Sequence, residues 1–189
     1  MKLFLASRSP RRIEMLTALG AELEIVPSDI DEEAYSAPTP AALVRILAEA
    51  KAKAARADDT VAPIVAADTV VDLDGTVLGK PKDAADAARM LRALSGRSHL
   101  VHTGIAVSYR GQILAETETA TVHFRALSEE ELARYVNSRE PMDKAGSYGI
   151  QGLASLFVTG IEGDYHSVVG LPLCRLNRML ARLDAPTLI

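Results

Sequence analysis

The chain has 189 residues, of which 48% are hydrophobic, 24% charged and 4% aromatic, and its formal net charge is −4. This length and apolar content suffice for one well-packed core or two small lobes. The acidic balance excludes a global basic field for nucleic acid, and the absence of tryptophan leaves few platforms for base stacking.

The number of cysteines and the length of the apolar runs indicate the cellular compartment. The single cysteine, Cys174, excludes an internal disulfide and a cysteine-based zinc site, and its leucine-rich surroundings predict a small core residue. The apolar run after Met1 is too short for a signal peptide, and no stretch approaches the roughly 20 apolar residues of a membrane span. We therefore expect a cytoplasmic protein that binds neither nucleic acid nor membranes.

The N-terminal segment predicts a strand that leads directly into a helix. Leu3–Ala6 is a short apolar run, and Ser9 followed by Pro10 is typical of a helix start. Three arginines surround this start, at Arg8, Arg11 and Arg12. Free N–H groups, the helix dipole and guanidinium groups all favour an anion there, although solvated surface arginines are the alternative.

A second strand, Glu22–Val26, precedes a strongly acidic segment. Its carboxylates lie at Asp29, Asp31, Glu32 and Glu33. Such a segment is usually a solvated loop, but beside an arginine cluster it is also suited to a divalent cation, because Mg²⁺ prefers oxygen ligands.

The next segment, from Ala41 to about Ala57, predicts a long amphipathic helix. Its expected inner face consists of Leu43, Ile46, Leu47, Ala50 and Ala54. Lys51 and Lys53 lie near its end, where they either favour the helix dipole or reach toward phosphate.

An apolar run from Ile64 to Val71 is interrupted by Asp68 and Thr69. Asp74-Gly75 and a second short apolar run follow, which predicts two strands joined by a tight turn, before Gly79-Lys80-Pro81. A carboxylate inside a buried strand costs several kcal/mol unless it is paired or binds a cation. Asp68 is therefore either a functional group, or a structural residue that caps a turn or lies at a strand end and faces water.

The middle of the chain predicts a helix at 83–94, a long hairpin of strands at 98–109 and 112–125, and a helix capped by Ser128. The hairpin carries His99, His102 and His123, for which the spacing favours cross-strand structural roles over metal ligation.

The last third contains a glycine-punctuated segment, residues 140–152, in which Gln151 is suited to hydrogen bonds with a base edge. We then expect a strand at Ser155–Ile161, a returning strand at Tyr165–Val169 and a final helix at about 171–183.

These features together favour a nucleotide or phosphate-ester hydrolase. Basic groups beside carboxylates fit metal-assisted attack on a phosphate, in which a carboxylate orients or deprotonates water. The sequence has no serine-histidine-aspartate elbow and no signature of a nucleophilic cysteine.

Eight motifs, in order along nearly the whole chain, resemble the Maf family of nucleoside triphosphate pyrophosphatases. They are SRSPRR (7–12), SDIDE (28–32), LAEAKA (47–52), ADTVV (67–71), LGKP (78–81), LSGRSH (94–99), DKAGSYGIQG (143–152) and VGLP (169–172).

The resemblance implies an α/β fold in which residues 1–189 form a single domain. The expected architecture is an elongated mixed β-sheet flanked by helices, with two lobes and a central cleft, similar to inosine triphosphate pyrophosphatase-like folds. The implied reaction hydrolyses a nucleoside triphosphate between its α- and β-phosphates with Mg²⁺ or Mn²⁺. A homodimer is also implied.

The resemblance also assigns roles to residues. Asp68 matches the family's proton acceptor, and Glu32 and Asp68 are the expected metal ligands. The positions linked to substrate choice are Arg11, Thr69 and Gln151. Polar residues gathered around the triphosphate and metal correspond to Ser7, Arg12, Glu32, Lys51 and Lys80.

Asp68-Thr69 after alanine, together with Ile150-Gln151-Gly152, resembles the branch that acts on dTTP and UTP. Two alternatives are the branch acting on 7-methylguanosine triphosphate and a non-enzymatic nucleotide-binding regulator of septum formation. The departures from the family pattern are mild, at Arg8 and His102, and neither affects the expected activity.

Overall fold

The computed structural model describes all residues, 1–189, which form six α-helices and seven β-strands. The strands are β1 (Lys2–Leu5), β2 (Glu22–Ile25), β3 (Ile64–Leu73), β4 (Thr76–Leu78), β5 (Ser98–Tyr109), β6 (Gln112–Phe124) and β7 (Val158–Glu162). The helices are α1 (Pro10–Ala18), α2 (Pro40–Ala54), α3 (Ala84–Leu94), α4 (Glu129–Asn137), α5 (Tyr165–Val169) and α6 (Leu173–Arg182).

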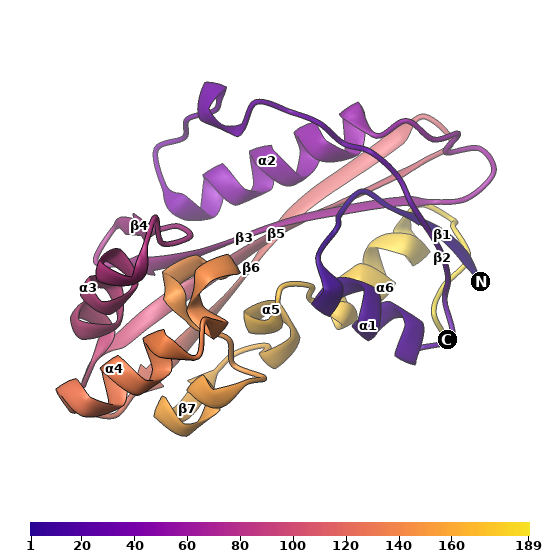
Figure 1. The fold of residues 1–189 in the computed structure, drawn as a ribbon. Coiled ribbons are helices and arrows are strands. Elements are labelled where there is room, and N and C mark those ends of the chain that lie inside the picture. The colour runs from indigo at the N-terminus through magenta and orange to yellow at the C-terminus, as the bar shows by residue number, and fades with distance from the viewer. The chain divides into compact units, whose positions relative to one another are not determined.

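The strands form one mixed sheet with the order β2-β1-β3-β5-β6-β7, and β4 pairs with β3 beside this path. β1 pairs in parallel with both β2 and β3, whereas β4 pairs antiparallel with β3 and β7 antiparallel with β6. Parallel strands need a crossover connection, which α1 provides between β1 and β2 (Figure 1). The predicted α/β class with a mixed sheet flanked by helices is therefore confirmed.

The chain divides into two compact units. The first unit comprises residues 1–68, 103–118 and 170–189, and the second comprises residues 69–102 and 119–169. The chain passes from one unit to the other within β3, β5 and β6. The expected cleft stays a prediction.

Small side chains allow α2 to approach the sheet closely in the first unit. Ala48 and Ala52 on α2 are buried in a core that also contains Ala66 and Ala106 from the strands. A Cβ on Gly104 of β5 would lie 2.0 Å from the backbone oxygen of Val44 on α2, so no larger residue fits there. Figure 1 shows α2 lying along these strands.

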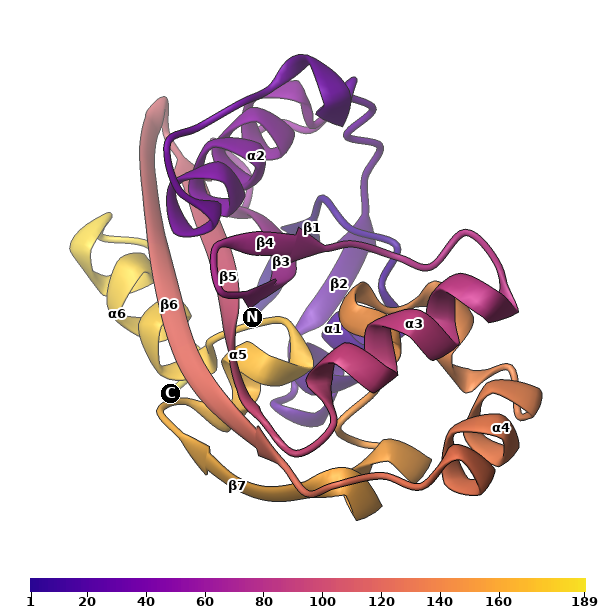
Figure 2. The ribbon, with the colours of Figure 1, turned by 90° about the vertical axis from the view of Figure 1, so that its left-hand side faces the viewer.

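The second unit has a larger and more aromatic core. Leu91 and Leu94 of α3 pack with Leu132 of α4, and the two helices lie side by side (Figure 2). Four aromatic rings complete this core, those of Phe124, Tyr135, Tyr148 and Phe157. Phe124 meets both Tyr148 and Phe157 edge to face, and Phe157 meets Tyr135 in the same way, which is a preferred geometry for aromatic side chains.

The predicted β3–β4 hairpin is confirmed. Asp74 and Gly75 adopt φ values of 53° and 83°, the left-handed conformation that a tight hairpin turn requires. The carboxylate of Asp72 accepts a hydrogen bond from the Gly75 amide at 2.7 Å, which stabilises this turn.

Two strand predictions near the C-terminus are wrong in part. Residues Leu153–Phe157 form a 3₁₀ helix, so that β7 begins only at Val158. The expected returning strand, Tyr165–Val169, is the short helix α5, in which Asp164 accepts a hydrogen bond from the His166 amide and begins the turn. Apolar content identified buried segments here, but it does not distinguish short strands from short helices.

Two burial predictions are also wrong. The buried face of α2 consists of Val44, Leu47, Ala48 and Ala52, so that of the predicted inner positions only Leu47 is confirmed, and Leu43, Ile46, Ala50 and Ala54 are only half-buried. Cys174 is exposed at the start of α6, because the buried face of this amphipathic helix contains Leu176, Met179 and Leu180 instead.

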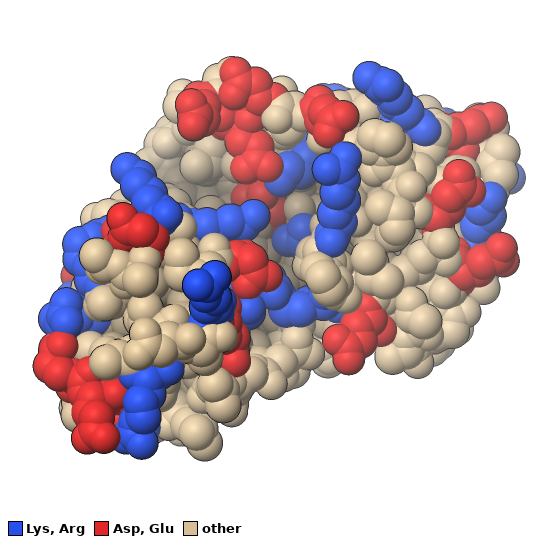
Figure 3. Space-filling view, viewed as in Figure 1, with Lys and Arg blue, Asp and Glu red and all other residues tan.

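The surface carries charges of both signs. Figure 3 shows Lys and Arg side chains interspersed with Asp and Glu side chains on the face that it draws. No helix is long and apolar enough to cross a membrane.

Candidate functional site

The start of α1 is organised around the guanidinium group of Arg12. Its Nε donates to the backbone oxygen of Gly170 at 2.7 Å, and its Nη1 donates to the Ala67 oxygen at 2.9 Å and to Ser7 Oγ at 3.0 Å. Ser7 Oγ also accepts from the Ser9 amide at 3.2 Å. Arg12 thereby ties the helix start to β3 at the residue that precedes Asp68.

The electrostatic setting of Arg12 is unusual for an arginine. Burial, together with the positive charge of Arg11, lowers the pKa of Arg12 to about 10, although the negative charges of Asp68 and Glu32 oppose this shift. Arg12 still carries its charge at neutral pH. The helix start therefore presents a fixed positive group, as the anion-site interpretation requires.

The ammonium group of Lys51 lies between two carboxylates. Lys51 Nζ is 2.6 Å from Asp68 Oδ1 and 2.8 Å from Glu32 Oε1. The side chains of Lys51 and Asp68 are only 14% and 13% exposed, whereas that of Glu32 is 55% exposed. Asp68 is thus the partly buried functional candidate within β3, and its charge is compensated by a residue from α2.

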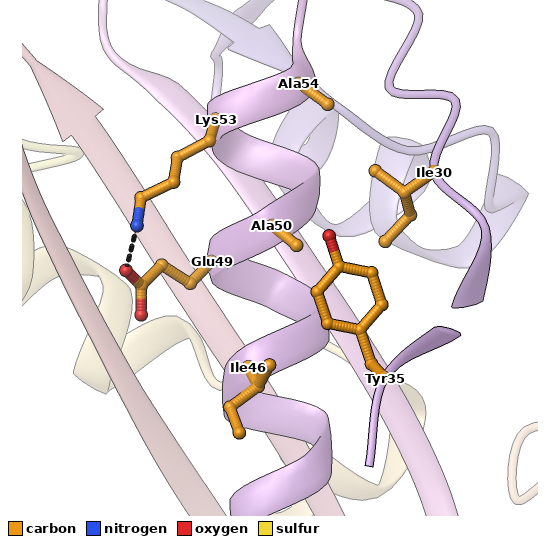
Figure 4. Close-up of a pocket in the computed structure, with 7 residues that line it drawn as sticks. All are labelled: Ile30, Tyr35, Ile46, Glu49, Ala50, Lys53 and Ala54. Carbon is orange, nitrogen blue, oxygen red and sulfur yellow. Dashed lines mark hydrogen bonds and ion pairs between the residues drawn. The ribbon is translucent and has the colours of Figure 1, made fainter. Parts of the chain in front are cut away.

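The acidic segment that carries Glu32 lies beside α2. Asp31 caps the short 3₁₀ helix Glu32–Ala34 by accepting from the Glu33 amide. Figure 4 shows Ile30 and Tyr35, on either side of this turn, directed toward α2. Together with Ile46, Glu49, Ala50, Lys53 and Ala54 they line a surface hollow of about 450 Å³. The face of α2 that contains Ala50 and Ala54 therefore lines this hollow and does not belong to the buried face of the helix.

The carboxylates of Glu32 and Asp68 fit a divalent cation that is completed by phosphate. Both already contact a single cationic centre, Lys51 Nζ, so the two carboxylates face the same positively charged group. No group of three or more His, Cys, Asp or Glu side chains is placed to hold a metal by itself. Mg²⁺ is commonly bound by one or two carboxylates plus substrate phosphates, which is the donor set available here.

The second unit carries three more of the predicted residues, Thr69, Lys80 and Gln151. Thr69 follows Asp68 on β3 and is half-buried, while Lys80 and Gln151 are exposed. The segments that carry them are connected, since the amide of Gly146 donates to the oxygen of Gly79 at 3.0 Å. A Cβ on Gly146 would lie 2.7 Å from Val71 on β3, so this glycine also permits close contact.

The histidines of the β5–β6 hairpin have structural partners, as predicted. His102 contacts Thr119 across the strands at 2.8 Å and Asp72 at 3.1 Å. His123 lies 2.7 Å from Ser98 and 3.0 Å from Glu162. His99 lies 2.8 Å from the hydroxyl of Tyr148, its Nδ1 has no partner, and burial lowers its pKa to about 4.

The structure thus brings Ser7, Arg12, Glu32, Lys51 and Asp68 together in the first unit: Ser7 contacts Arg12, Lys51 contacts both carboxylates, and Arg12 donates to the oxygen of Ala67, the residue before Asp68. Arg11 precedes Arg12 on α1 and is half-buried. Sequence reasoning overlooked the polar groups that hold the glycine segment, Tyr135 and Glu140. Tyr135 carried no polar signal in the sequence, because its place in an apolar helix pattern indicates only a core position.

Comparison with known proteins identifies the family. The family model described as Maf-like protein matches residues 2–183. This chain belongs to that family. A dTTP/UTP pyrophosphatase from Moorella thermoacetica is 52% identical to this Maf-like chain over 182 residues, covering 95% of the chain and 94% of the relative. A dTTP/UTP pyrophosphatase from Thermosipho africanus is 46% identical over 176 residues, covering 93% of this chain and 90% of the relative.

A solved structure supports the fold. The HAM1 protein from Coxiella burnetii is similar to this Maf-like chain with a TM-score of 0.52 and 19% identity, covering 96% of this chain and 99% of that protein. At this level of identity the similarity concerns the fold alone, and it agrees with the predicted fold class.

Proposed function

We propose that this Maf-like protein hydrolyses dTTP and UTP to the nucleoside monophosphate and pyrophosphate, with CTP and modified pyrimidine nucleotides as further candidate substrates. The single observation that carries the proposal is Asp68, a carboxylate within a buried strand that Lys51 holds at 2.6 Å. The names of relatives about half identical over nearly their full length support the choice of dTTP and UTP.

The proposed chemical step is attack of water on the α-phosphorus. Asp68 accepts a proton from the water as its oxygen bonds to phosphorus. The bond from the α-phosphorus to the oxygen shared with the β-phosphate breaks, and pyrophosphate leaves with that oxygen. The ion pair with Lys51 orients the carboxylate so that one of its oxygens is available for this proton.

Positively charged side chains offset the negative charge that develops on the phosphates. Arg12 and Lys51 lie beside Asp68, and we assign the same task to Arg11 and Lys80, with Ser7 as a polar contact. The anchoring of Arg12 to backbone oxygens keeps its charge in place, so little reorganisation accompanies the reaction.

Glu32 and Asp68 would hold Mg²⁺ or Mn²⁺ together with phosphate oxygens of the nucleotide. When bound, the ion would draw electron density from these oxygens and so make the α-phosphorus more susceptible to attack by water. We assign recognition of the pyrimidine base to Thr69 and Gln151, because an amide offers both a donor and an acceptor to a base edge.

We further propose that residues 1–189 act as a single domain, that the protein works in the cytoplasm, where its proposed substrates are made and used, and that it is a homodimer. Light scattering of the purified protein tests the oligomeric state: a monomer mass would contradict the dimer without affecting the proposed reaction.

Release of pyrophosphate from a panel of nucleotides tests the activity. The panel contains dTTP, UTP, CTP, GTP and 7-methylguanosine triphosphate, each with Mn²⁺ and with EDTA. We expect dTTP and UTP to be hydrolysed fastest with Mn²⁺ and not at all with EDTA. Preference for 7-methylguanosine triphosphate would assign the chain to the other branch, and no pyrophosphate from any nucleotide would favour a non-enzymatic regulator.

A further inference from the structure

Gln151 lies on a tight backbone turn. The amide of Gly152 donates to the oxygen of Gly149 at 3.0 Å, which places Ile150 and Gln151 at the two central positions. The side chain of Gln151 is exposed there. Because this turn is irregular backbone, the position of Gln151 depends on what holds the two ends of the turn.

A short chain of hydrogen bonds joins those two ends. The amide of Gly149 donates to the hydroxyl of Tyr135 at 3.3 Å, and this hydroxyl donates to Glu140 Oε1 at 3.0 Å. Glu140 Oε2 accepts from the amide of Leu153 at 2.9 Å. Tyr135 and Glu140 therefore close a ring around the turn, which we call the Tyr135–Glu140 clasp.

The glycines on either side of Gln151 allow the clasp to lie directly against the backbone. A Cβ on Gly152 would be 2.3 Å from Glu140 Oε1, and a Cβ on Gly149 would be 2.6 Å from Cε of Lys144. Neither glycine has a left-handed φ. Glycine is therefore needed at these positions because a side chain would not fit, and not because of the backbone angle. Lys144 Nζ in turn donates to the backbone oxygen of Glu140 at 2.7 Å.

The clasp is anchored in the core of the second unit. Tyr135 is 3% exposed, and its ring meets that of Phe157 edge to face with centroids 5.0 Å apart. Burial and then the charge of Glu140 raise the pKa of the Tyr135 hydroxyl. The hydroxyl therefore remains a hydrogen-bond donor to Glu140 throughout the neutral pH range.

We propose that Tyr135 and Glu140 are positioning residues that set nucleotide selectivity by fixing the turn that presents Gln151. This inference rests on the proposed role of Gln151 in reading the pyrimidine base. Neither residue needs to touch the nucleotide, because both act through the backbone amides of Gly149 and Leu153.

Selectivity is measured as the ratio of kcat/KM for dTTP to kcat/KM for dGTP. Tyr135→Phe removes only the hydroxyl, and we expect it to lower this ratio by about 3- to 10-fold, the size of one lost hydrogen bond. The loss should come from a higher KM for dTTP, with kcat nearly unchanged, because the catalytic groups are not altered. Glu140→Ala should lower the ratio similarly, and Glu140→Gln, which keeps an acceptor, should restore most of it.

The matched control is Tyr109→Phe, which removes the hydroxyl of another buried tyrosine, 6% exposed, in the first unit. We expect it to leave the ratio unchanged. Tyr135→Phe combined with Gln151→Ala should be no less selective than Gln151→Ala alone, since the clasp acts through that residue. An equal fall of kcat for both nucleotides, with KM unchanged, would indicate a merely structural role and overturn the inference.

Amide hydrogen exchange in the nucleotide-free protein tests the clasp independently of activity. We expect faster exchange at Gly149 in Tyr135→Phe and at Leu153 in Glu140→Ala, and unchanged exchange at both in Tyr109→Phe. Unchanged exchange in all variants would overturn the clasp.

If exchange accelerates as expected but Gln151→Ala leaves selectivity unaltered, the proposed role of Gln151 fails and the selectivity inference fails with it. If Gln151→Ala alters selectivity and the clasp variants do not, only the inference fails.

Discussion

In the first unit, the predicted catalytic residue is held by an ion pair, whereas in the second unit the turn that carries the predicted base-reading residue is held by hydrogen bonds from backbone amides and by close packing. Asp68 is oriented by Lys51 at 2.6 Å, and Lys51 also contacts Glu32. Gln151 is placed by backbone hydrogen bonds to Tyr135 and Glu140. The difference follows from the task, because phosphate chemistry needs concentrated charge, while base recognition needs a hydrogen-bonding group in a fixed position.

The cores that support these two groups also differ, in the size of the side chains that fill them. Alanines and Gly104 allow α2 to approach the sheet, which brings Lys51 to Asp68. Aromatic rings fill the core under the glycine segment, and Tyr135 belongs both to that core and to the clasp. In the first unit the position of the charged groups therefore depends on small residues in the core. In the second unit the position of the turn depends on large aromatic rings, one of which carries a hydroxyl group.

The largest effect is expected when the negative charge of Asp68 in the first unit is removed. Asp68→Asn should lower dTTP turnover by at least about 100-fold, the typical contribution of a general base. The fold should persist, because the amide oxygen still accepts from Lys51. Pyrophosphate release and circular dichroism check this prediction.

The matched control for Asp68→Asn is Asp74→Asn in the same hairpin. Asp74 is an exposed residue with a φ of 53°, which asparagine adopts readily, and its partner is Arg97. Turnover should be normal in this variant. Normal turnover in Asp68→Asn as well would disprove the assigned role.

The second largest effect concerns protein stability and tests the close packing of α2 on the sheet. Gly104→Ala should lower the free energy of unfolding by about 3 kcal/mol, because the added Cβ would meet the Val44 backbone, which cannot move without shifting the helix. Gly79→Ala is the control, since nothing lies within 4 Å of its added Cβ and its φ is not left-handed. Urea denaturation measures both, and an equal effect of the two substitutions would contradict the packing argument.

The third effect is specific to the aromatic core of the second unit. Burial lowers the pKa of His99 from 6.5 to about 4, so between these values the unfolded chain binds more protons than the folded protein. Its contribution to stability is complete above pH 6.5 and is lost as the pH falls toward 4. Between pH 7 and pH 5 this loss amounts to about 2 kcal/mol.

Urea denaturation of wild type and His99→Gln at pH 7 and pH 5 measures this contribution. The variant should lose less stability on acidification than wild type does. His166→Gln, at an exposed histidine, should behave as wild type. Identical pH dependence in all three proteins would show that His99 does not carry the effect.

The smallest effect concerns an ion pair on the surface of the second unit. Arg92 on α3 donates to both carboxylate oxygens of Glu129 on α4, and both side chains are more than half exposed. Arg92→Ala should leave the thermal midpoint indistinguishable from that of wild type, because solvent screens exposed pairs. A marked decrease would mean that the contact between α3 and α4 depends on charge as well as on its apolar core.

Regular elements with long patterns were predictable from the sequence. The β5–β6 hairpin, the β3–β4 turn at Asp74-Gly75 and the capped helix α4 have the predicted places, because alternation, left-handed turn residues and capping groups act locally. The short segments after Gln151 were not predictable in this way. A short segment with only a few apolar residues is compatible with a 3₁₀ turn, a strand or a short helix, and its packing against neighbouring elements decides which of them forms.

The sequence by itself also determined the family and the charged candidates, since these depend on residue types and their order along the chain. The tertiary structure decided which of these side chains meet. The rotation of α2 that directs Lys51 to Asp68 depends on the shape of the sheet surface at Gly104 and the neighbouring alanines. The clasp joins residues from α4 and from the glycine segment, whose contact depends on packing in three dimensions. Long-range contacts of this kind have no local pattern, so only the folded chain reveals them.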